Sequence, residues 1–374
     1  MRVLLTGGGT AGHINPALAI AEIVLKEDPN SEIAFVGIRG GKEEDLVPRE
    51  GFALHFVKSK GIDRKKKKWS PQNLHAYWLA LTSPYSPNTV RIIKKFRPDI
   101  VIGTGGYACW PIMAAAARMG IPTALHESNA MPGLAVRRLQ NKVDLVWINF
   151  EDTKARLNES ELVKKVGNPL RQGFGAYSYA EARRMLGIAP ETKLVLSFGG
   201  SQGAENVNSA VLEMMRSYSS KAPNLLHVHA SGQRDYENTR ARFVEMGLDQ
   251  CSQCVLKEYI YDMPIQMAAA DLVISRAGAM TLSELAHMKK ACILIPSPHV
   301  ADDHQYLNAK ALADQGAAIL VEEKTLATNT LTKAAESVLA SATKHAKMQE
   351  AIAAFADESV NKQIWNHILQ LTKR

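Results

Sequence analysis

The stretch "LLTGGGTAGHINPALAIAE", residues 4–22, joins a short apolar run to a helical pattern through a cluster of glycines. Gly7, Gly9 and Gly12 satisfy G-x-G-x-x-G, the spacing of a dinucleotide-binding loop between a strand and a helix. Backbone N–H groups at such a helix start can bind phosphate. His13 follows at once, although a loop that holds a passive cofactor needs no imidazole there. The stretch therefore predicts an α/β domain with an anion-facing loop and a histidine beside it.

A nicotinamide cofactor is not the expected ligand of this loop. The dinucleotide fingerprint also includes an acidic residue at the end of the second strand, which binds the ribose. Here that strand ends in "FVGIRGG", residues 35–41, and the first carboxylate is Glu43. We therefore expect no cofactor.

The strand–glycine–helix pattern occurs again in the second half of the chain. Apolar runs alternate with helical patterns up to about residue 150, and the pattern restarts in "KLVLSFGGSQGAENVNSAVLEMM", residues 193–215. Such alternation is typical of doubly wound α/β domains with parallel sheets. The sequence predicts two Rossmann-like domains that face each other across a cleft, with both glycine loops at the carboxyl ends of the strands.

The domain boundary is expected where glycine and proline cluster in "KKVGNPLRQGF", residues 164–174. The last residues carry apolar side chains at helical spacing and predict a terminal helix. The expected organisation is an N-terminal domain, a C-terminal domain, and a terminal helix that packs back toward the first domain: residues 1–166, 167–357 and 358–374.

The composition is that of an ordinary globular protein, with 374 residues, 46% apolar and 22% charged. The four cysteines are too few for a disulfide scaffold, and Cys251-x-x-Cys254 has no partner pair at zinc-ligand spacing. Met1 leads directly into an apolar run without the pattern of a signal peptide. We expect a cytoplasmic location, two ordinary thiols at this pair, and no metal site.

Positive charge is concentrated in residues 58–97, which carry eleven Lys and Arg residues against Asp63 alone, while the whole chain has a net charge of +8. Such an excess indicates an anionic partner surface, either nucleic acid or lipid headgroups. No uncharged run here is apolar enough to span a bilayer, because Trp69–Val90 contains three prolines. Lys65–Lys68 precede apolar residues largely at helical spacing, which predicts membrane docking through residues 64–81. The apolar members are Trp69, Leu74, Tyr77, Trp78 and Leu81. The alternative is that this stripe packs inward and the lysines are simply solvated.

A third glycine loop lies in "SRAGAMTLSELA", residues 275–286, with a helix expected from about Met280. Thr281-x-x-Glu284 fits a capping box, a purely structural role. Alternatively, the backbone N–H groups of Ala279 to Thr281 bind a phosphate and Glu284 binds two ribose hydroxyls. The sequence leaves both interpretations open.

Further motifs complete a resemblance that covers essentially the whole chain. They are "GTGGYACWP", "HESNAMPG", "GNPLR", "SFGGSQGA", "YIYDM" and "DDHQYLNA", in this order with the first and third glycine loops. Together they resemble the MurG family of peptidoglycan glycosyltransferases. The resemblance implies the GT-B fold and inverting transfer of N-acetylglucosamine from UDP-N-acetylglucosamine to the C4 hydroxyl of undecaprenyl-pyrophosphoryl-N-acetylmuramoyl-pentapeptide (lipid I), giving lipid II, an activity of the EC 2.4.1.227 type.

The resemblance also implies partners, a location and substrate-binding residues. It predicts a peripheral protein on the cytoplasmic face of the cell membrane, bound to an anionic membrane surface. It predicts no binding of nucleic acid, and it is compatible with association with other cell-wall enzymes. The residues it implies for donor phosphates, sugar, uracil and ribose are Thr10, Ala11, Gly12, Asn129, Arg171, Ser201, Ile260, Ala279, Met280, Thr281, Glu284 and Gln305.

The attacking hydroxyl needs a general base, and histidine suits that role near neutral pH. His13 is the first candidate, with a structural or ligand-orienting role as its alternative, and Glu127 is the second candidate. His126 is either a packing residue or an acceptor contact. The sequence contains no Asp-x-Asp, so transfer without a metal is expected, with leaving-group charge met by helix N-termini. The competing functions are a UDP-sugar epimerase of the same fold and a lipid glycosyltransferase with another acceptor.

Overall fold

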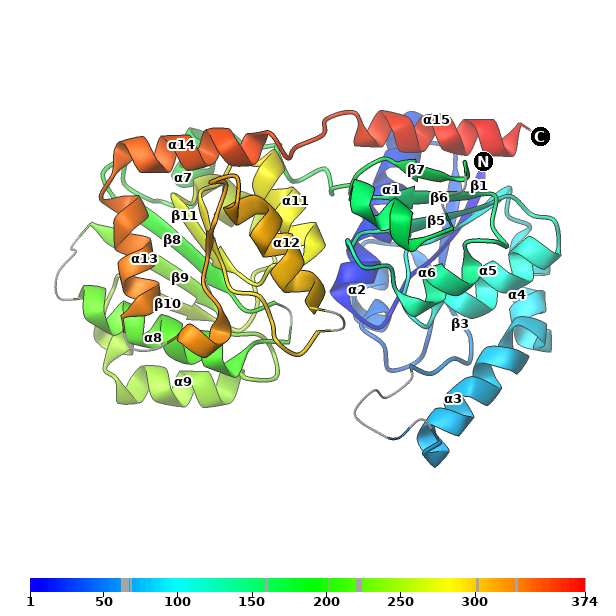
Figure 1. The fold of residues 1–374 in the computed structure, drawn as a ribbon, viewed down its shortest axis with the longest axis horizontal. Helices are drawn as coiled ribbons and strands as arrows, with labels where there is room; N and C mark the ends of the chain where they lie inside the picture. Colours follow the sequence, from blue (N-terminus) through cyan, green and yellow to red (C-terminus); the bar gives the residue numbers. More distant parts are fainter. Residues whose placement is uncertain are drawn as a thin grey trace. The chain divides into compact units, whose positions relative to one another are not determined.

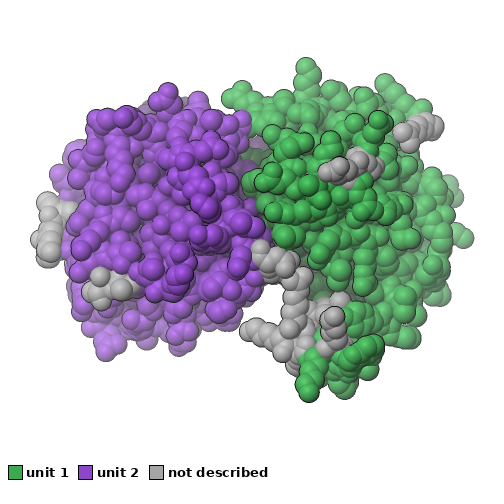
Figure 2. Space-filling model, viewed as in Figure 1, with its two compact units in different colours: residues 1–171, 357–374 green, residues 172–356 purple. Residues whose placement is uncertain are grey.

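The structure is a computed structural model that describes residues 1–61, 67, 69–158, 161–200, 202–219, 224–300, 303–326 and 329–373. The chain forms two compact units, residues 1–171 with 357–374 (unit 1) and residues 172–356 (unit 2), which Figure 2 colours separately. The predicted pair of parallel-sheet α/β domains is confirmed.

Unit 1 contains a seven-stranded, all-parallel sheet in the order β3-β2-β1-β4-β5-β6-β7. Its strands are β1 (Arg2–Thr6), β2 (Glu32–Gly37), β3 (Ala53–Phe56), β4 (Ile100–Gly103), β5 (Thr123–Glu127), β6 (Leu145–Ile148) and β7 (Val163–Lys165). Thr6 at the end of β1 is paired with both Val36 and Gly103. The strand order reverses between β1 and β4, and ligands of doubly wound sheets bind at such a switch point.

Helices cover both faces of this sheet (Figure 1). The helices of unit 1 are α1 (Ala11–Glu27), α2 (Glu43–Arg49), α3 (Pro71–Thr82), α4 (Pro87–Phe96), α5 (Cys109–Arg118), α6 (Leu134–Leu139) and α15 (Val360–Thr372), with short 3-10 turns η1 (Ser83–Tyr85) and η2 (Glu151–Arg156). Of these, α3 extends away from the sheet (Figure 1). Ile364 and Ile368 of α15 are fully buried in the same core cluster as Ile20 of α1. The C-terminal helix therefore completes the core of unit 1.

Unit 2 repeats the arrangement with a six-stranded parallel sheet in the order β10-β9-β8-β11-β12-β13. Its strands are β8 (Lys193–Phe198), β9 (Leu225–Ala230), β10 (Cys254–Lys257), β11 (Leu272–Ser275), β12 (Cys292–Leu294) and β13 (Ile319–Leu320). Its helices are α7 (Tyr179–Met185), α8 (Glu205–Ser219), α9 (Tyr236–Glu245), α10 (Met263–Ala269), α11 (Ala279–His287), α12 (His304–Ala313), α13 (Thr330–Leu339) and α14 (Ala342–Ala353), with 3-10 turns η3 (Leu248–Gln250) and η5 (Glu323–Thr325). The switch point lies between β8 and β11, which the second and third glycine loops follow.

The first helix begins earlier than the sequence predicts. We expect it from about Pro16, but α1 starts at Ala11 and contains Pro16. A proline at this position cannot donate to the carbonyl of Gly12, and its ring crowds that carbonyl, yet the helix continues through it. The early start places His13 in the first turn of α1.

Candidate active site

The loops that follow β1 and β4 meet directly at the switch point of unit 1. A Cβ atom on Gly106 would lie 2.1 Å from the carbonyl oxygen of Gly8, and Gly106 has a φ of 78°. Only glycine fits this conformation and this approach. The neighbouring Gly105 lies under the imidazole of His13, where a Cβ would be 2.8 Å from Nδ1. The glycines in "GTGGY" thus bring the β4 loop against the histidine of the first loop.

His13 is held by the backbone and the side chain of one residue, Thr104. Its Nδ1 lies 3.0 Å from the carbonyl oxygen of Thr104, and the Thr104 hydroxyl donates to the carbonyl of His13 at 2.6 Å. A carbonyl oxygen only accepts, so this bond places the proton of the neutral ring on Nδ1. Nε2 then carries the lone pair and has no hydrogen bond to a described residue. The partly buried imidazole is oriented to accept a proton at Nε2.

The first glycine loop is partly satisfied from within the protein. Glu43, the first residue of α2, is only 1% exposed. It accepts hydrogen bonds from the N–H groups of Gly9 at 3.1 Å and Ile38 at 3.0 Å. The Gly9 N–H is therefore already used and is not available to an anion. Thr10, Ala11 and Gly12 form the start of α1, and the Thr10 side chain does not cap the helix.

Glu127, at the end of β5, organises the loop that carries Asn129. Its Oε1 accepts from the backbone N–H of Asn129 at 2.9 Å and from its side-chain amide at 3.0 Å, while Oε2 accepts from the N–H of Gly133 at 2.7 Å. A buried carboxylate with three such bonds stabilises a loop. Its geometry is therefore less suited than that of His13 to take a proton from a substrate.

His126 is fully buried, so of the two roles left open for it the structure supports packing. Its Nε2 donates to the carbonyl of Gly167 at 2.9 Å, which joins β5 to the start of the segment between the units. Burial lowers the pKa of His126 to about 4, so the ring is neutral at physiological pH.

Arg171 is already paired within unit 1. Its Nε lies 3.2 Å from the carboxylate of Glu22 on α1, and its Nη2 lies 2.7 Å from that of Glu50. Burial lowers the pKa of Arg171, but the charges of Glu50 and Glu22 outweigh that effect and leave the pKa above its usual value. The guanidinium expected to meet a diphosphate is thus shared with two carboxylates.

In unit 2 the second glycine loop packs on the residues that follow β9. A Cβ on Gly203, which has a φ of 90°, would lie 2.2 Å from the carbonyl oxygen of Ser231. Beneath this contact, the buried Ser197 hydroxyl lies 2.8 Å from His227 Nε2 and 2.9 Å from His229 Nδ1. Burial lowers the pKa of His227 to about 3 and that of His229 to about 4. Two neutral histidines therefore support the loop, and Ser201 lies outside the described residues.

The third loop leads into α11, which begins at Ala279, close to the predicted start at Met280. The N-cap is Gly278, so Thr281 is the third residue inside the helix and cannot be the N-cap of a capping box. The capping-box interpretation of Thr281 and Glu284 is therefore wrong. Glu284 is 8% exposed on the second turn.

Two amide side chains of α12 hold the loops beside α11. Gln305 Oε1 accepts from the N–H of Ser297 at 2.9 Å, which leaves the amide nitrogen without a partner among the described residues. Asn308, 1% exposed, donates to the carbonyl of Ala277 at 3.3 Å. Ile260 is 3% exposed in the loop after β10, so its side chain belongs to the core, and only its main chain could contact a base.

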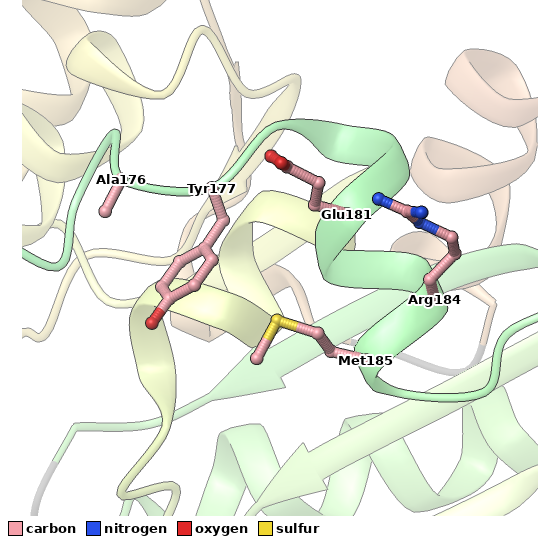
Figure 3. A pocket seen from close by; sticks show the side chains of 5 residues that line it. All are labelled: Ala176, Tyr177, Glu181, Arg184 and Met185. Atoms are coloured by element: carbon pink, nitrogen blue, oxygen red, sulfur yellow. The ribbon is translucent and has the colours of Figure 1, made fainter.

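A surface hollow of about 500 Å³ lies elsewhere on unit 2 (Figure 3). It is lined by Ala176, Tyr177, Glu181, Arg184 and Met185, on α7 and the segment before it. None of the predicted site residues lines it, so we do not assign it to the site.

The apolar stripe of α3 faces outward from unit 1. Trp78 and Leu81 are 59% and 74% exposed, and Trp69 just before the helix is 80% exposed. Leu74 is exposed and Tyr77 is half-buried, whereas Ala76 and Leu79 on the other face are buried. The alternative that the whole stripe packs inward is wrong for Leu74, Trp78 and Leu81. Lys67 is exposed, while Arg64 to Lys66 and Lys68 lie outside the described residues.

Two parallel Rossmann-like sheets in one chain, each with glycine loops at its switch point, define the GT-B class of glycosyltransferases, and solved structures support this fold. A crystal structure of MurG from Acinetobacter baumannii superposes with a TM-score of 0.72 at 25% identity, covering 99% of each chain. A UDP-GlcNAc 2-epimerase from Neisseria meningitidis, solved with UDP-GlcNAc bound, has a TM-score of 0.68 at 15% identity and covers 99% of this chain and 100% of its own. At that identity the second likeness shows the fold alone.

Sequence relatives narrow the class to a family. The models of the glycosyltransferase family 28 N-terminal and C-terminal domains match residues 3–148 and 194–364. A curated UDP-N-acetylglucosamine–N-acetylmuramyl-(pentapeptide) pyrophosphoryl-undecaprenol N-acetylglucosamine transferase from Acetivibrio thermocellus is 38% identical over 373 residues, covering 100% of this chain and 99% of its own. This chain belongs to glycosyltransferase family 28.

Proposed function

We propose that this chain transfers N-acetylglucosamine from UDP-N-acetylglucosamine to the C4 hydroxyl of lipid I and so forms lipid II for peptidoglycan. The observation that carries the proposal is the full-length identity of 38% to a curated transferase named for this donor and this acceptor. The arrangement of His13, Thr104 and the two glycine loops of unit 1 supports it, because the oriented imidazole has Nε2 available to take a proton from a hydroxyl.

In the proposed reaction the C4 hydroxyl oxygen of the acceptor attacks C1 of the donor sugar. The bond from C1 to the β-phosphate oxygen breaks, UDP leaves, and the hydroxyl proton passes to Nε2 of His13. Attack from the side opposite the leaving group inverts the α linkage of the donor to a β-1,4 bond. Asn129, on the loop that Glu127 organises, would contact the N-acetylglucosamine, as would the amide nitrogen of Gln305.

The donor nucleotide would bind unit 2. The N-terminus of α11, at Ala279 to Thr281, would meet a phosphate, and Glu284 would accept hydrogen bonds from ribose hydroxyls. The main chain at Ile260 would contact uracil. We assign residues 1–166 to the acceptor and residues 167–357 to the donor, with the segment 358–374 belonging to the acceptor side.

Charge on the departing UDP would be met by these helix N-termini and by nearby polar groups, without a resident metal, as in an enzyme of the EC 2.4.1.227 type. Turnover that is unchanged in a strong chelator supports this part of the proposal. Loss of turnover that Mg²⁺ or Mn²⁺ restores contradicts it.

The acceptor is a lipid, and in the described part of the chain no helix is both long and apolar enough to cross a bilayer. We propose that residues 64–81 dock unit 1 on the anionic cytoplasmic surface of the cell membrane. The exposed Trp69, Trp78 and Leu81 supply apolar contacts, and the lysine run supplies charge attraction.

The decisive experiment mixes the protein with UDP-N-acetylglucosamine and a soluble short-chain lipid I analogue, followed by product analysis. A β-1,4 disaccharide and one UDP for each sugar transferred support the proposal. Conversion of the donor to another UDP-sugar without an acceptor identifies an epimerase instead. Release of UDP with no disaccharide contradicts transfer.

A further inference from the structure

A nearly buried ion pair joins the third glycine loop of unit 2 to the 3-10 turn η5. Arg276, directly after β11, and Glu323, at the start of η5, are joined at 2.5 Å between Nη2 and Oε2. Their side chains are 12% and 7% exposed. Buried ion pairs contribute little net stability, because the cost of desolvating the two charges offsets their attraction. The groups that this pair connects are therefore the guide to its role.

The guanidinium of Arg276 is not available to a ligand. Its Nη1 donates to the carbonyls of Ile295 at 3.2 Å and Pro296 at 3.1 Å, just beyond β12, while Nη2 faces Glu323. Arg276 therefore fixes the loop 276–278, and with it the start of α11, to the end of β12.

The carboxylate of Glu323 also reaches α8, the helix that follows the second glycine loop. Its Oε1 accepts from the side-chain amide of Asn206 at 2.6 Å, and Asn206 lies in the first turn of α8. One carboxylate thus connects the two helices whose N-termini follow the second and third glycine loops. No local spacing in the sequence links these three residues, because Glu323 follows Asn206 by 117 positions.

We propose that Glu323 is a positioning residue for the donor diphosphate, which keeps the starts of α8 and α11 at the separation needed to bind it together. This inference rests on the proposed function. A helix N-terminus attracts an anion only over about its first turn. Two helix N-termini can therefore bind the same diphosphate only when they are held close to each other. A preformed site also avoids the cost of ordering the loops on binding.

The test measures UDP affinity by calorimetry and steady-state transfer for three variants. Glu323→Ala removes both contacts and should weaken UDP binding about tenfold, raising the donor KM with little change in kcat or in the acceptor KM. Glu323→Gln retains a hydrogen-bonding side chain and should recover most of this loss. Asn206→Ala breaks one contact at an exposed residue and should weaken UDP binding about threefold.

Asp271→Asn is the matched control. It perturbs a second buried ion pair among the described residues of unit 2, in which Asp271, directly before β11, lies 3.3 Å from Arg183 of α7. This variant should lose thermal stability but keep the UDP affinity of the parent. An unchanged UDP affinity in folded Glu323→Ala overturns the proposal. So does an equal loss of affinity in Asp271→Asn, because the effect is then one of general stability. If Glu323→Ala does not fold, unchanged affinity in Asn206→Ala overturns it.

The same measurements distinguish a wrong transferase assignment from a wrong positioning role for Glu323. If the parent chain binds UDP and shows the predicted pattern of variants but forms no disaccharide, the positioning role stands and the transferase assignment is wrong.

Discussion

The two units share a strand order and a glycine loop at the switch point, yet they use those loops differently. In unit 1 the loops close on each other, with Gly106 against Gly8, and an internal carboxylate, Glu43, takes the N–H of Gly9. The imidazole of His13 lies beside these two loops, against Gly105 and Thr104. In unit 2 one carboxylate, that of Glu323, pairs with Arg276 in the third loop and accepts from Asn206 in the first turn of α8.

This difference explains how one fold can serve two halves of a reaction. A loop in which an internal carboxylate holds a backbone amide, as Glu43 holds the N–H of Gly9, is restrained and can present a side chain at a fixed place. The start of a helix attracts an anionic ligand, and Glu323 links the starts of α8 and α11 in unit 2. Under the proposed function, unit 1 would serve proton transfer and unit 2 nucleotide binding, and the predictions that follow test this division.

The largest expected effect concerns His13. We expect His13→Ala to lower kcat by about 10²–10⁴-fold, the usual cost of losing a general base, while UDP affinity stays nearly unchanged. Turnover assays and calorimetry with UDP measure the two effects separately. Equal losses in both would move His13 to the phosphate site, and full activity would remove it from the mechanism.

The second prediction concerns acid. His227 and His229 of unit 2 have pKa values lowered by burial to about 3 and about 4, from 6.5. Unit 1 has one fully buried histidine of this kind, His126, whose pKa is lowered to about 4, while burial also lowers the pKa of the half-buried His367. Below pH 6.5 the unfolded chain binds protons that these folded histidines do not, so stability falls as the pH falls, by about 1.4 kcal/mol per pH unit for each histidine. We expect unit 2 to unfold at a higher pH than unit 1.

Spectroscopy can separate the two acid transitions, because the five tryptophans all lie in unit 1. On acidification, far-UV circular dichroism should lose signal before tryptophan fluorescence changes. A fluorescence change that comes first would show that the buried histidines of unit 2 do not set the acid limit.

The sequence predicts the features that depend on neighbouring residues. The strand–glycine–helix runs predict both sheets, and the apolar spacing after residue 358 predicts α15. It also places His13 next to a glycine loop. The interactions it misses join residues far apart in the chain, such as Glu43 with Gly9, Thr104 with His13, and Glu323 with Asn206. The sequence also could not decide between the capping box and ligand binding at Thr281, since the helix start at Ala279 depends on where β11 ends.

The third prediction tests the nucleotide role of unit 2. We expect Glu284→Ala to weaken UDP binding by about 1.5–3 kcal/mol, the usual contribution of hydrogen bonds to a charged group. Calorimetry with UDP measures the affinity, and a denaturant melt measures the free energy of unfolding. A loss of stability with unchanged affinity would assign Glu284 to the fold instead.

The smallest expected effect concerns the exposed face of α3. Trp78 is 59% exposed and stacks beside His75, with ring centroids 6.2 Å apart, so little of it contributes to the core. Trp78→Ser should weaken binding to anionic vesicles by about 1–2 kcal/mol, the contribution of one large apolar side chain moved out of water. It should leave transfer to a soluble acceptor analogue unchanged.

Val244→Ser, at an apolar residue of unit 2 that is 50% exposed, is the matched control and should bind vesicles as the parent does.

Replacing Lys65–Lys68 by serine should remove most of the binding and its salt dependence, because each lysine near an anionic surface contributes about 1 kcal/mol. Vesicle sedimentation at low and high salt measures all three proteins. If Trp78→Ser and the lysine variant both sediment as the parent does, residues 64–81 do not dock the protein on the membrane, and the outward face of α3 has another purpose.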